Sequence, residues 1–419
     1  MLRLKLILPI TLLISTSCTS SEDISEAFES QMESAKTTGL VSTRYITSHE
    51  ADSIAIAALT NFYTGDNKSR SVRNLTPKQT YIYETSKSRS INNDTTFYVV
   101  NVAPEGFALV AADRRIKEPI YAFSDKGSFD DSSENPGLKL YLEIMKADIK
   151  AATANADSLP DLPIGPENPP HPGGFQPVDP SELAIVEIDG IKYYASSSNK
   201  HENVDTMLVT KWGQGTPFNR YCLDKNGNPR LAGCVAVALS QILSYHRIQF
   251  PGHTYDWDTM LDLPGDGLLS DQAKEDIAHL IYTVGTKAKI NYHEDSKSDI
   301  FKARDCLKDI GFKNVKILES WEESILTSIK NHGPIYMRAK DNKDGHAWVV
   351  DGYHRDITTT NYFTLDKMYY ATSVVDTKFL HINWGWKGAG NAYYRQCSSY
   401  EPSGYKFNKD IMYIINITK

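Results

Sequence analysis

A cysteine at the start of an apolar helix is the strongest chemical signal in this 419-residue sequence. Gly233 and Cys234 open a run in which Val235, Leu239 and Ile242 recur at spacings of three and four. That spacing predicts a helix with one buried face. A thiol at its N-terminus would lie against free backbone N–H groups and the positive end of the helix dipole, which favours thiolate. A small core cysteine without a role is the alternative, since free cysteines are often buried.

A cysteine nucleophile needs a base, and His346 is the best candidate among the 11 histidines. It follows Gly345 at the start of an apolar strand-like run, so we expect its imidazole to be exposed at the edge of a cleft above a buried strand. His246 and His253 follow the helix and are interpreted as capping or packing residues. His381 begins another strand, in which Asn383 and Trp384 are stronger candidates for a catalytic role than His381 itself.

Three further side chains suit the same chemistry. The Asn383 carboxamide oxygen can accept from an imidazole N–H and fix its tautomer, and Trp384 beside it can shield that bond from water. Upstream of the cysteine, Gln214 can donate its carboxamide N–H to an oxyanion hole together with the Cys234 N–H. Each signal alone is weak, because a glycine-rich turn with core tryptophans would look the same.

The N-terminus indicates export. Residues 1–18 contain positive residues, an apolar stretch over 6–14 and small residues that end in Cys18. The apolar stretch is too short to span a bilayer as a mature helix. A cysteine directly after the cleavage site resembles a bacterial lipoprotein signal, so we expect Cys18 to carry lipid and to be the only membrane contact. Plain secretion is the alternative, because Ser15 stands where such signals usually carry leucine.

Composition narrows the function classes. A net charge of −7 without a compensating basic block argues against a nucleic-acid partner. The hydrophobic fraction of 41% is enough for ordinary cores. Besides Cys18 and Cys234 there are Cys222, Cys306 and Cys397, which allow at most one disulfide among them, and the sequence does not choose the pair. We therefore expect the fold to be stabilised by its hydrophobic core and not by disulfides. The protein is also expected to be exported and to be a monomer.

The composition divides the chain into a polar tether (19–47), a small α+β domain (48–155), a proline-rich linker and processing region (156–200) and a compact domain (201–419). We expect the last domain to have a helical lobe followed by a strand-rich lobe, with a cleft between them. Residues 196–202 are interpreted as an exposed polar loop. Helices are expected over 50–64, 138–153, 234–246, 270–284, 299–309 and 321–331, and strands over 80–84, 96–102, 107–111, a hairpin at 183–195, 334–338, 346–353, 361–373, 378–383 and 410–417.

Motifs in a fixed order resemble the streptopain family of papain-like cysteine peptidases. In the second half they are Trp212-Gly-Gln214-x-x-Pro217-Phe218-Asn219, Gly233-Cys234-Val235-Ala236 with Gln241-Ile242 and Tyr245-His246, Gly345-His346-Ala347 with Asp351-Gly352-Tyr353, and Asn383-Trp384-Gly385-Trp386. The first half is similar to the propeptides of bacterial members, in phrases that begin at Phe97, Gly106 and Tyr121.

The resemblance implies a role for each residue. Cys234 would be the nucleophile, His346 the general base and acid and Gln214 the oxyanion donor, with Asn383 and Trp384 positioning the imidazole. The fold would be a papain-like two-lobed domain behind an α+β propeptide. That propeptide would inhibit the enzyme until the chain is cut near residues 190–205.

The resemblance also bounds the partners and cofactors. Protein or peptide substrates and the chain's own propeptide are the expected partners, and no cofactor is expected. Asp344, His346 and Asp351 fit no usual metal-ligand set, so no metal is expected there. Departures from the family after Tyr292 and in the charged loop before Gly345 leave the substrate preference open and would leave the chemistry unchanged.

Two alternative functions remain open at this point. A catalytically silent binding or inhibitor protein on the same scaffold would be expected to lack Cys234 or His346, and both are present. A thiol amidase or acyltransferase acting on the cell wall would use the same residue types, and no wall-binding repeat is visible in the sequence.

Overall fold

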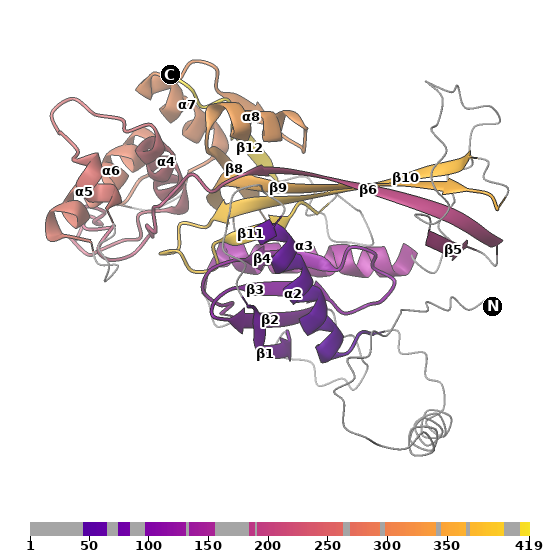
Figure 1. Cartoon of the computed structure of the whole chain (residues 1–419). Coiled ribbons are helices and arrows are strands. Elements are labelled where there is room, and N and C mark those ends of the chain that lie inside the picture. Colours follow the sequence, from indigo (N-terminus) through magenta and orange to yellow (C-terminus); the bar gives the residue numbers. More distant parts are fainter. Residues whose placement is uncertain are drawn as a thin grey trace. The chain divides into compact units, whose positions relative to one another are not determined.

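A computed structural model describes residues 45–64, 74–83, 97–130, 134–155, 184–188, 191–262, 269–293, 298–340, 345–365, 369–397 and 411–419 (Figure 1). The expected export signal with Cys18, nearly all of the tether and most of the proline-rich linker lie outside the described residues. Within the described part, no helix combines the length and the apolar character that a bilayer crossing requires.

The described residues fall into two compact units. The main unit contains 47–160, 199–358 and 375–419, and therefore both the N-terminal α+β domain and most of the C-terminal domain. The second unit contains 161–198 and 359–374, together with the chain's first residues. The expected functional residues from Gln214 to Trp384 all belong to the main unit.

A sheet of 12 strands organises the described residues, in the order β1-β2-β3-β4-β11-β10-β9-β8-β12-β7, with β6 pairing with both β5 and β9. The strands are β1 (Thr76–Ile82), β2 (Phe97–Ala103), β3 (Phe107–Ala111), β4 (Ile120–Ser124), β5 (Ala184–Ile188), β6 (Ile191–Val204), β7 (Lys316–Leu318), β8 (Ile335–Lys340), β9 (Gly345–Phe363), β10 (Tyr369–Asn383), β11 (Ala392–Arg395) and β12 (Met412–Ile415).

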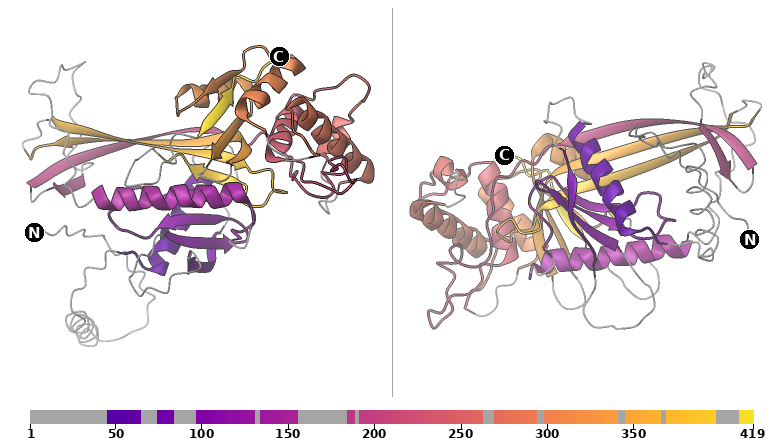
Figure 2. Two further views of the ribbon diagram at one scale, coloured as in Figure 1. Left: turned by 180° about the vertical axis from the view of Figure 1, so that it is seen from behind. Right: turned by 60° about the horizontal axis from the view of Figure 1, so that its bottom comes forward.

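The N-terminal domain is a four-stranded meander between two helices. Figures 1 and 2 show α2 (Ser48–Thr64) and α3 (Pro136–Asn155) on opposite faces of β1 to β4. In α2, Ala51, Ala55 and Leu59 are fully buried, at the four-residue spacing of one helix face. On the other side, apolar residues of α3 pack in one core with alternate residues of β2 and β3.

This domain joins the C-terminal domain edge to edge. In β4, Phe123 and Ala122 pair antiparallel with Tyr393 and Tyr394 of β11. Strand addition satisfies a row of backbone groups that would otherwise form an open sheet edge. The two domains predicted from composition therefore share one continuous sheet.

The C-terminal domain has its helices in its first half, as predicted. They are α4 (Cys234–Tyr245), α5 (Trp257–Leu261), α6 (Asp271–Lys287), α7 (Ile300–Ile310) and α8 (Ser324–His332). Most of α4 is buried, because it packs against α6 on one side and against β8 on another. The predictions for α4, α6, α7 and α8 are confirmed; α5 and the short strands β4, β7 and β11 were not predicted.

One loop prediction and one strand prediction were wrong. Residues 196–202 form part of β6 rather than a loop. Their Ser, Asn, Lys and Glu side chains are largely exposed, so the apolar alternation that marks a half-buried strand is missing. The span 361–373, predicted as one strand, instead contains the end of β9 and the beginning of β10. The hairpin at 183–195 is confirmed by the pairing of β5 with β6.

Candidate active site

Helix α4 begins at Cys234, as the sequence predicts. Gly233 precedes it as the N-cap residue at φ 86°, a backbone conformation that favours glycine. The segment upstream turns back beside this helix start, because the Ala232 N–H donates to the Gln214 carbonyl oxygen over 2.9 Å. Tyr292 also holds the segment before Cys234, since its hydroxyl donates to the Ala232 carbonyl oxygen over 3.0 Å. The backbone at Gln214 therefore lies close to the start of α4, as predicted.

The surroundings of Cys234 disfavour the thiolate in this structure. Burial raises its pKa above the ordinary value. Backbone N–H groups of Ala347, Val235 and Cys234 and the positive charge of Arg338 act in the opposite direction but do not overcome burial. The helix-terminus donors that the sequence predicts are thus in place, while burial opposes the thiolate that they favour.

His346 lies at the start of β9, paired with Ala339 of β8. The expectation of an exposed imidazole was wrong, because only 5% of the residue is accessible. Its Nε2–H donates to the Trp384 carbonyl oxygen over 3.3 Å. Burial lowers the pKa of His346 to about 4, so the imidazole is neutral near pH 7.

The strand geometry separates this imidazole from the thiol. Consecutive side chains of a strand point to opposite faces. Ala347 packs in the core that contains α4 and borders Cys234, whereas Trp348 packs in the core that contains Trp384 and α3. The His346 ring lies on the same face of the strand as the Trp348 ring, and the two ring centroids are 6.1 Å apart. Ala347, the residue after His346, therefore faces Cys234, whereas the His346 side chain lies on the opposite face of β9.

The first turn of α3 covers the imidazole. A Cβ added at Gly137 would lie 2.4 Å from His346 Cδ2 and 2.6 Å from Trp384 Cε3, so only glycine fits there without a shift. Asn135 caps this turn, since its Oδ1 accepts from the Gly137 and Leu138 N–H groups over 3.0 and 3.2 Å. Its Nδ2 reaches across to the Ala389 carbonyl oxygen at 3.4 Å. The N-terminal domain thus contacts the predicted catalytic base directly.

Asn383 and Trp384 are close to His346 but arranged differently from the expectation. The Asn383 Nδ2 donates to the Thr210 carbonyl over 2.8 Å, and its Oδ1 accepts from the Gly385 N–H over 3.1 Å. The partner of the imidazole is instead the Trp384 backbone. The Trp384 indole is fully buried and donates to the Gly390 carbonyl.

The other histidines have structural partners, as predicted for two of them. His246 is the C-cap of α4 and packs on Phe312. His253 contacts Asp276 at 3.1 Å, and His381 contacts the buried Asp351 at 2.6 Å. Asp351 is thus engaged away from His346, and Asp344 lies outside the described residues. Cys222, Cys306 and Cys397 are all free thiols, so none of the allowed disulfides forms among them.

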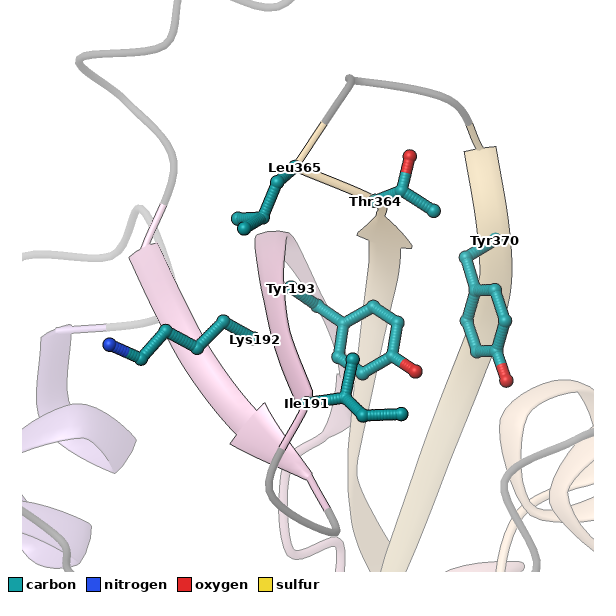
Figure 3. Close-up of a pocket in the computed structure, with 6 residues that line it drawn as sticks. All are labelled: Ile191, Lys192, Tyr193, Thr364, Leu365 and Tyr370. Atoms are coloured by element: carbon teal, nitrogen blue, oxygen red, sulfur yellow. The ribbon is translucent and has the colours of Figure 1, made fainter.

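A separate hollow lies in the second unit. Figure 3 shows Tyr193 and Tyr370 from different strands facing it, with Leu365 at its rim. None of the residues predicted for catalysis lines this hollow.

Comparison with known proteins identifies both halves of the chain. Residues 212–394 match the peptidase C10 family, and residues 43–149 match the Spi protease inhibitor family. These matches support a streptopain-like C10 cysteine peptidase. It is a cysteine endopeptidase with an inhibitor-like N-terminal domain.

Relatives of this C10 peptidase are distant in sequence. It is 23% identical to streptopain of Streptococcus pyogenes over 72% of this chain and 74% of that protein. It is also 23% identical to the thiol protease/hemagglutinin PrtT of Porphyromonas gingivalis, where the match covers 79% of this chain but spans only 37% of the relative. The fold resembles a prointerpain A fragment of Prevotella intermedia, with a TM-score of 0.54, 20% identity and coverage of 81% of this chain and 99% of that one.

Sequence reasoning missed the residues that cover His346. Their signal is the run Asn135-Pro136-Gly137, in which an N-cap residue, a proline at the first helical position and a glycine open a helix. That pattern predicts a helix start, but it does not indicate what the glycine packs against.

Proposed function

We propose that this chain is the latent zymogen of a cysteine endopeptidase, in which the N-terminal domain blocks catalysis by holding His346 away from Cys234. The observation that carries the proposal is the contact between Gly137, at the start of α3, and the His346 imidazole. A neutral imidazole hydrogen-bonded to a backbone carbonyl cannot accept a proton from the thiol at that nitrogen.

Release of the N-terminal domain restores the catalytic pair. With α3 gone, the imidazole is free to rotate from the Trp384 carbonyl toward the sulfur, and its contact with solvent returns its pKa toward the ordinary value. Proton transfer from Cys234 to His346 then gives a thiolate and an imidazolium, a pair that the α4 N-terminus and Arg338 favour.

Hydrolysis proceeds through an acyl-enzyme. The Cys234 thiolate attacks the scissile carbonyl carbon, and the C=O electron pair moves to oxygen, where the Cys234 N–H and Gln214 Nε2–H donate to it. His346 protonates the departing amine and then takes a proton from water as that water attacks the thioester. Collapse of the second tetrahedral intermediate releases the acid product and the thiol.

Maturation also requires β6 to leave the sheet. The expected processing region near 190–205 overlaps β6, which pairs with β9. A peptidase binds its substrate as an extended, unpaired segment, so this strand is protected while it remains in the sheet. Processing thus depends on local opening of β6.

The test is expression of residues 19–419 as wild type and as Cys234→Ala. Conversion of the wild type to a fragment beginning near 190–205, with the variant intact, establishes a self-maturing peptidase. If both chains stay full length, a trace of trypsin followed by a casein assay examines external activation. A trypsin-cut wild type that remains inactive on casein would rule the proposal out.

We further propose that the chain is exported and anchored by lipid on Cys18. Support comes from the charged, apolar and small-residue order of residues 1–18. The full chain should fractionate with membranes in a bacterial host, and Cys18→Ser should move it to the soluble exported fraction. Because the anchor would precede the inhibitory domain, processing would also free the catalytic domain; mature enzyme found only in membranes would contradict this release.

A further inference from the structure

Two histidines and one aspartate gather on one face of neighbouring strands, outside the catalytic residues. His354 and Asp356 are two positions apart on β9 and therefore share a face, and His201 comes from the paired strand β6. The His201 Nδ1 lies 2.5 Å and the His354 Nε2 3.0 Å from the same Asp356 Oδ1 atom. Their possible ligand atoms all lie within 4.8 Å of one another.

We propose that His201, His354 and Asp356 form a Zn²⁺ site. Two imidazole nitrogens and a carboxylate oxygen are a donor set that suits this borderline metal, whereas Ca²⁺ and Mg²⁺ prefer oxygen alone. With bonds of about 2.0–2.2 Å, tetrahedral ligand atoms lie roughly 3.3 Å apart, so small side-chain rotations that move Asp356 Oδ1 outward open the required space.

The surroundings suit a held cation. His354 is 8% exposed, and the rings of Phe62, Phe123 and Phe379 pack around it with centroids at 5.3, 6.0 and 6.4 Å. Such an apolar wall restricts the ring's rotation and limits competition from water. The His201 side chain is 41% exposed, which gives the metal an entry path.

A second carboxyl group lies close to the cluster. Glu118, in the N-terminal domain just before β4, is half-buried, and burial together with the nearby charge of Asp356 raises its pKa, while Arg395 opposes the shift. A divalent cation would relieve the repulsion between these two acids. Glu118 belongs to the N-terminal domain, while the three proposed ligands belong to the C-terminal domain.

The position of His201 gives the metal a consequence for processing. His201 lies in β6, within the region where cleavage is expected, so a metal bridging it to β9 would hold that strand in the sheet. This consequence rests on the proposed zymogen function, but the metal binding itself does not. Trypsin offers a direct readout, because Lys200 immediately precedes His201.

The binding experiment uses untagged residues 19–419 carrying Cys234→Ala, so that the catalytic thiol cannot bind metal. We expect one Zn²⁺ per chain by calorimetry, with a Kd on the order of 10 µM or tighter. Co²⁺ should give visible bands of a low-coordinate N/O site without thiolate charge transfer. His201→Gln and Asp356→Asn should each weaken binding more than about tenfold.

His253→Gln is the matched control, because His253 makes a comparable contact with Asp276 elsewhere. It should leave Zn²⁺ binding unchanged. Zn²⁺ should also slow tryptic cleavage after Lys200, as read from a new N-terminus at His201, and the His201→Gln variant should lose that protection. Absence of saturable binding, or equal binding by all variants, would mean that the cluster is hydrogen-bonded only and would overturn the proposal.

Discussion

Gly137 of α3 lies in direct contact with the imidazole of His346, close enough that a Cβ at Gly137 would be 2.4 Å from His346 Cδ2. The same Cβ would meet the ring of Trp384 at 2.6 Å. Both rings are buried and packed against other aromatic groups, so they have little room to move. The contact between α3 and His346 therefore depends on the absence of a side chain at one position.

Gly137→Ala should weaken latency. Overpacking of this kind costs about 1–3 kcal/mol, which shifts the balance between docked and undocked N-terminal domain at least fivefold. We expect a shorter lag before wild-type-like activity appears on casein, measured for residues 19–419. The control is Gly127→Ala in the same domain, where the backbone is strained at φ 67° but an added Cβ meets nothing within 4 Å. Equal lags for the two variants would show that general destabilisation, not the His346 contact, controls activation.

Acid should loosen the same contact. The pKa of His346 is about 4 when α3 covers it, below its ordinary value of 6.5. The depressed pKa means that docking is fully stable above pH 6.5 and loses stability as the pH falls from 6.5 toward 4, by up to about 3 kcal/mol. At pH 5 the expected loss is roughly 30-fold in the docking equilibrium.

Hydrogen exchange of the first turn of α3 measures this effect. In the Cys234→Ala chain, protection factors for amides near Leu138, corrected for intrinsic exchange, should fall between pH 7 and pH 5. The additional change His346→Gln keeps an N–H donor for the Trp384 carbonyl but cannot titrate, so it should abolish that pH dependence. A fall of the same size in both chains would assign it to other groups.

The sequence was sufficient for elements whose partners are local. Cys234 begins α4 as predicted, because the glycine, the cysteine and the apolar spacing all act within one helix. Residues 196–202 were misread because their partner in the sheet is β9, far along the chain, and the exposed side chains carry no apolar alternation.

The environment of His346 could not be predicted for a similar reason. Its strand was located correctly, but its burial comes from α3, which lies in the other half of the chain. The motif order predicts which residues react in the active enzyme. It does not indicate that the base is turned to the opposite face of β9 and that Asn383 bonds the backbone instead.

Asn135→Ala tests the cap that fixes the first turn of α3. Its loss removes an acceptor for the Gly137 and Leu138 N–H groups and should cost about 1 kcal/mol of stability. We expect a lower thermal midpoint of the Cys234→Ala proenzyme and, with Cys234 present, faster maturation. Asn135→Ser retains a capping oxygen without the donor to Ala389, so it should recover most of the midpoint. If serine and alanine behave alike, the contact with Ala389, rather than the cap, is what matters.

Asn383 and Gln214 should respond differently when each is changed to alanine. Asn383→Ala leaves the buried Thr210 carbonyl and Gly385 N–H without partners, which should lower the free energy of unfolding by about 1–3 kcal/mol.

In Gln214 it is the backbone carbonyl that joins the surrounding hydrogen bonds, and alanine retains it. Gln214→Ala should therefore change stability little while lowering kcat of the matured enzyme about 10²–10³-fold through loss of an oxyanion donor. Urea unfolding in the Cys234→Ala background and peptide hydrolysis with Cys234 present give the two readings. An unchanged kcat for Gln214→Ala would remove this residue from the oxyanion hole, and an unchanged unfolding free energy for Asn383→Ala would mean that its two bonds are replaced by water.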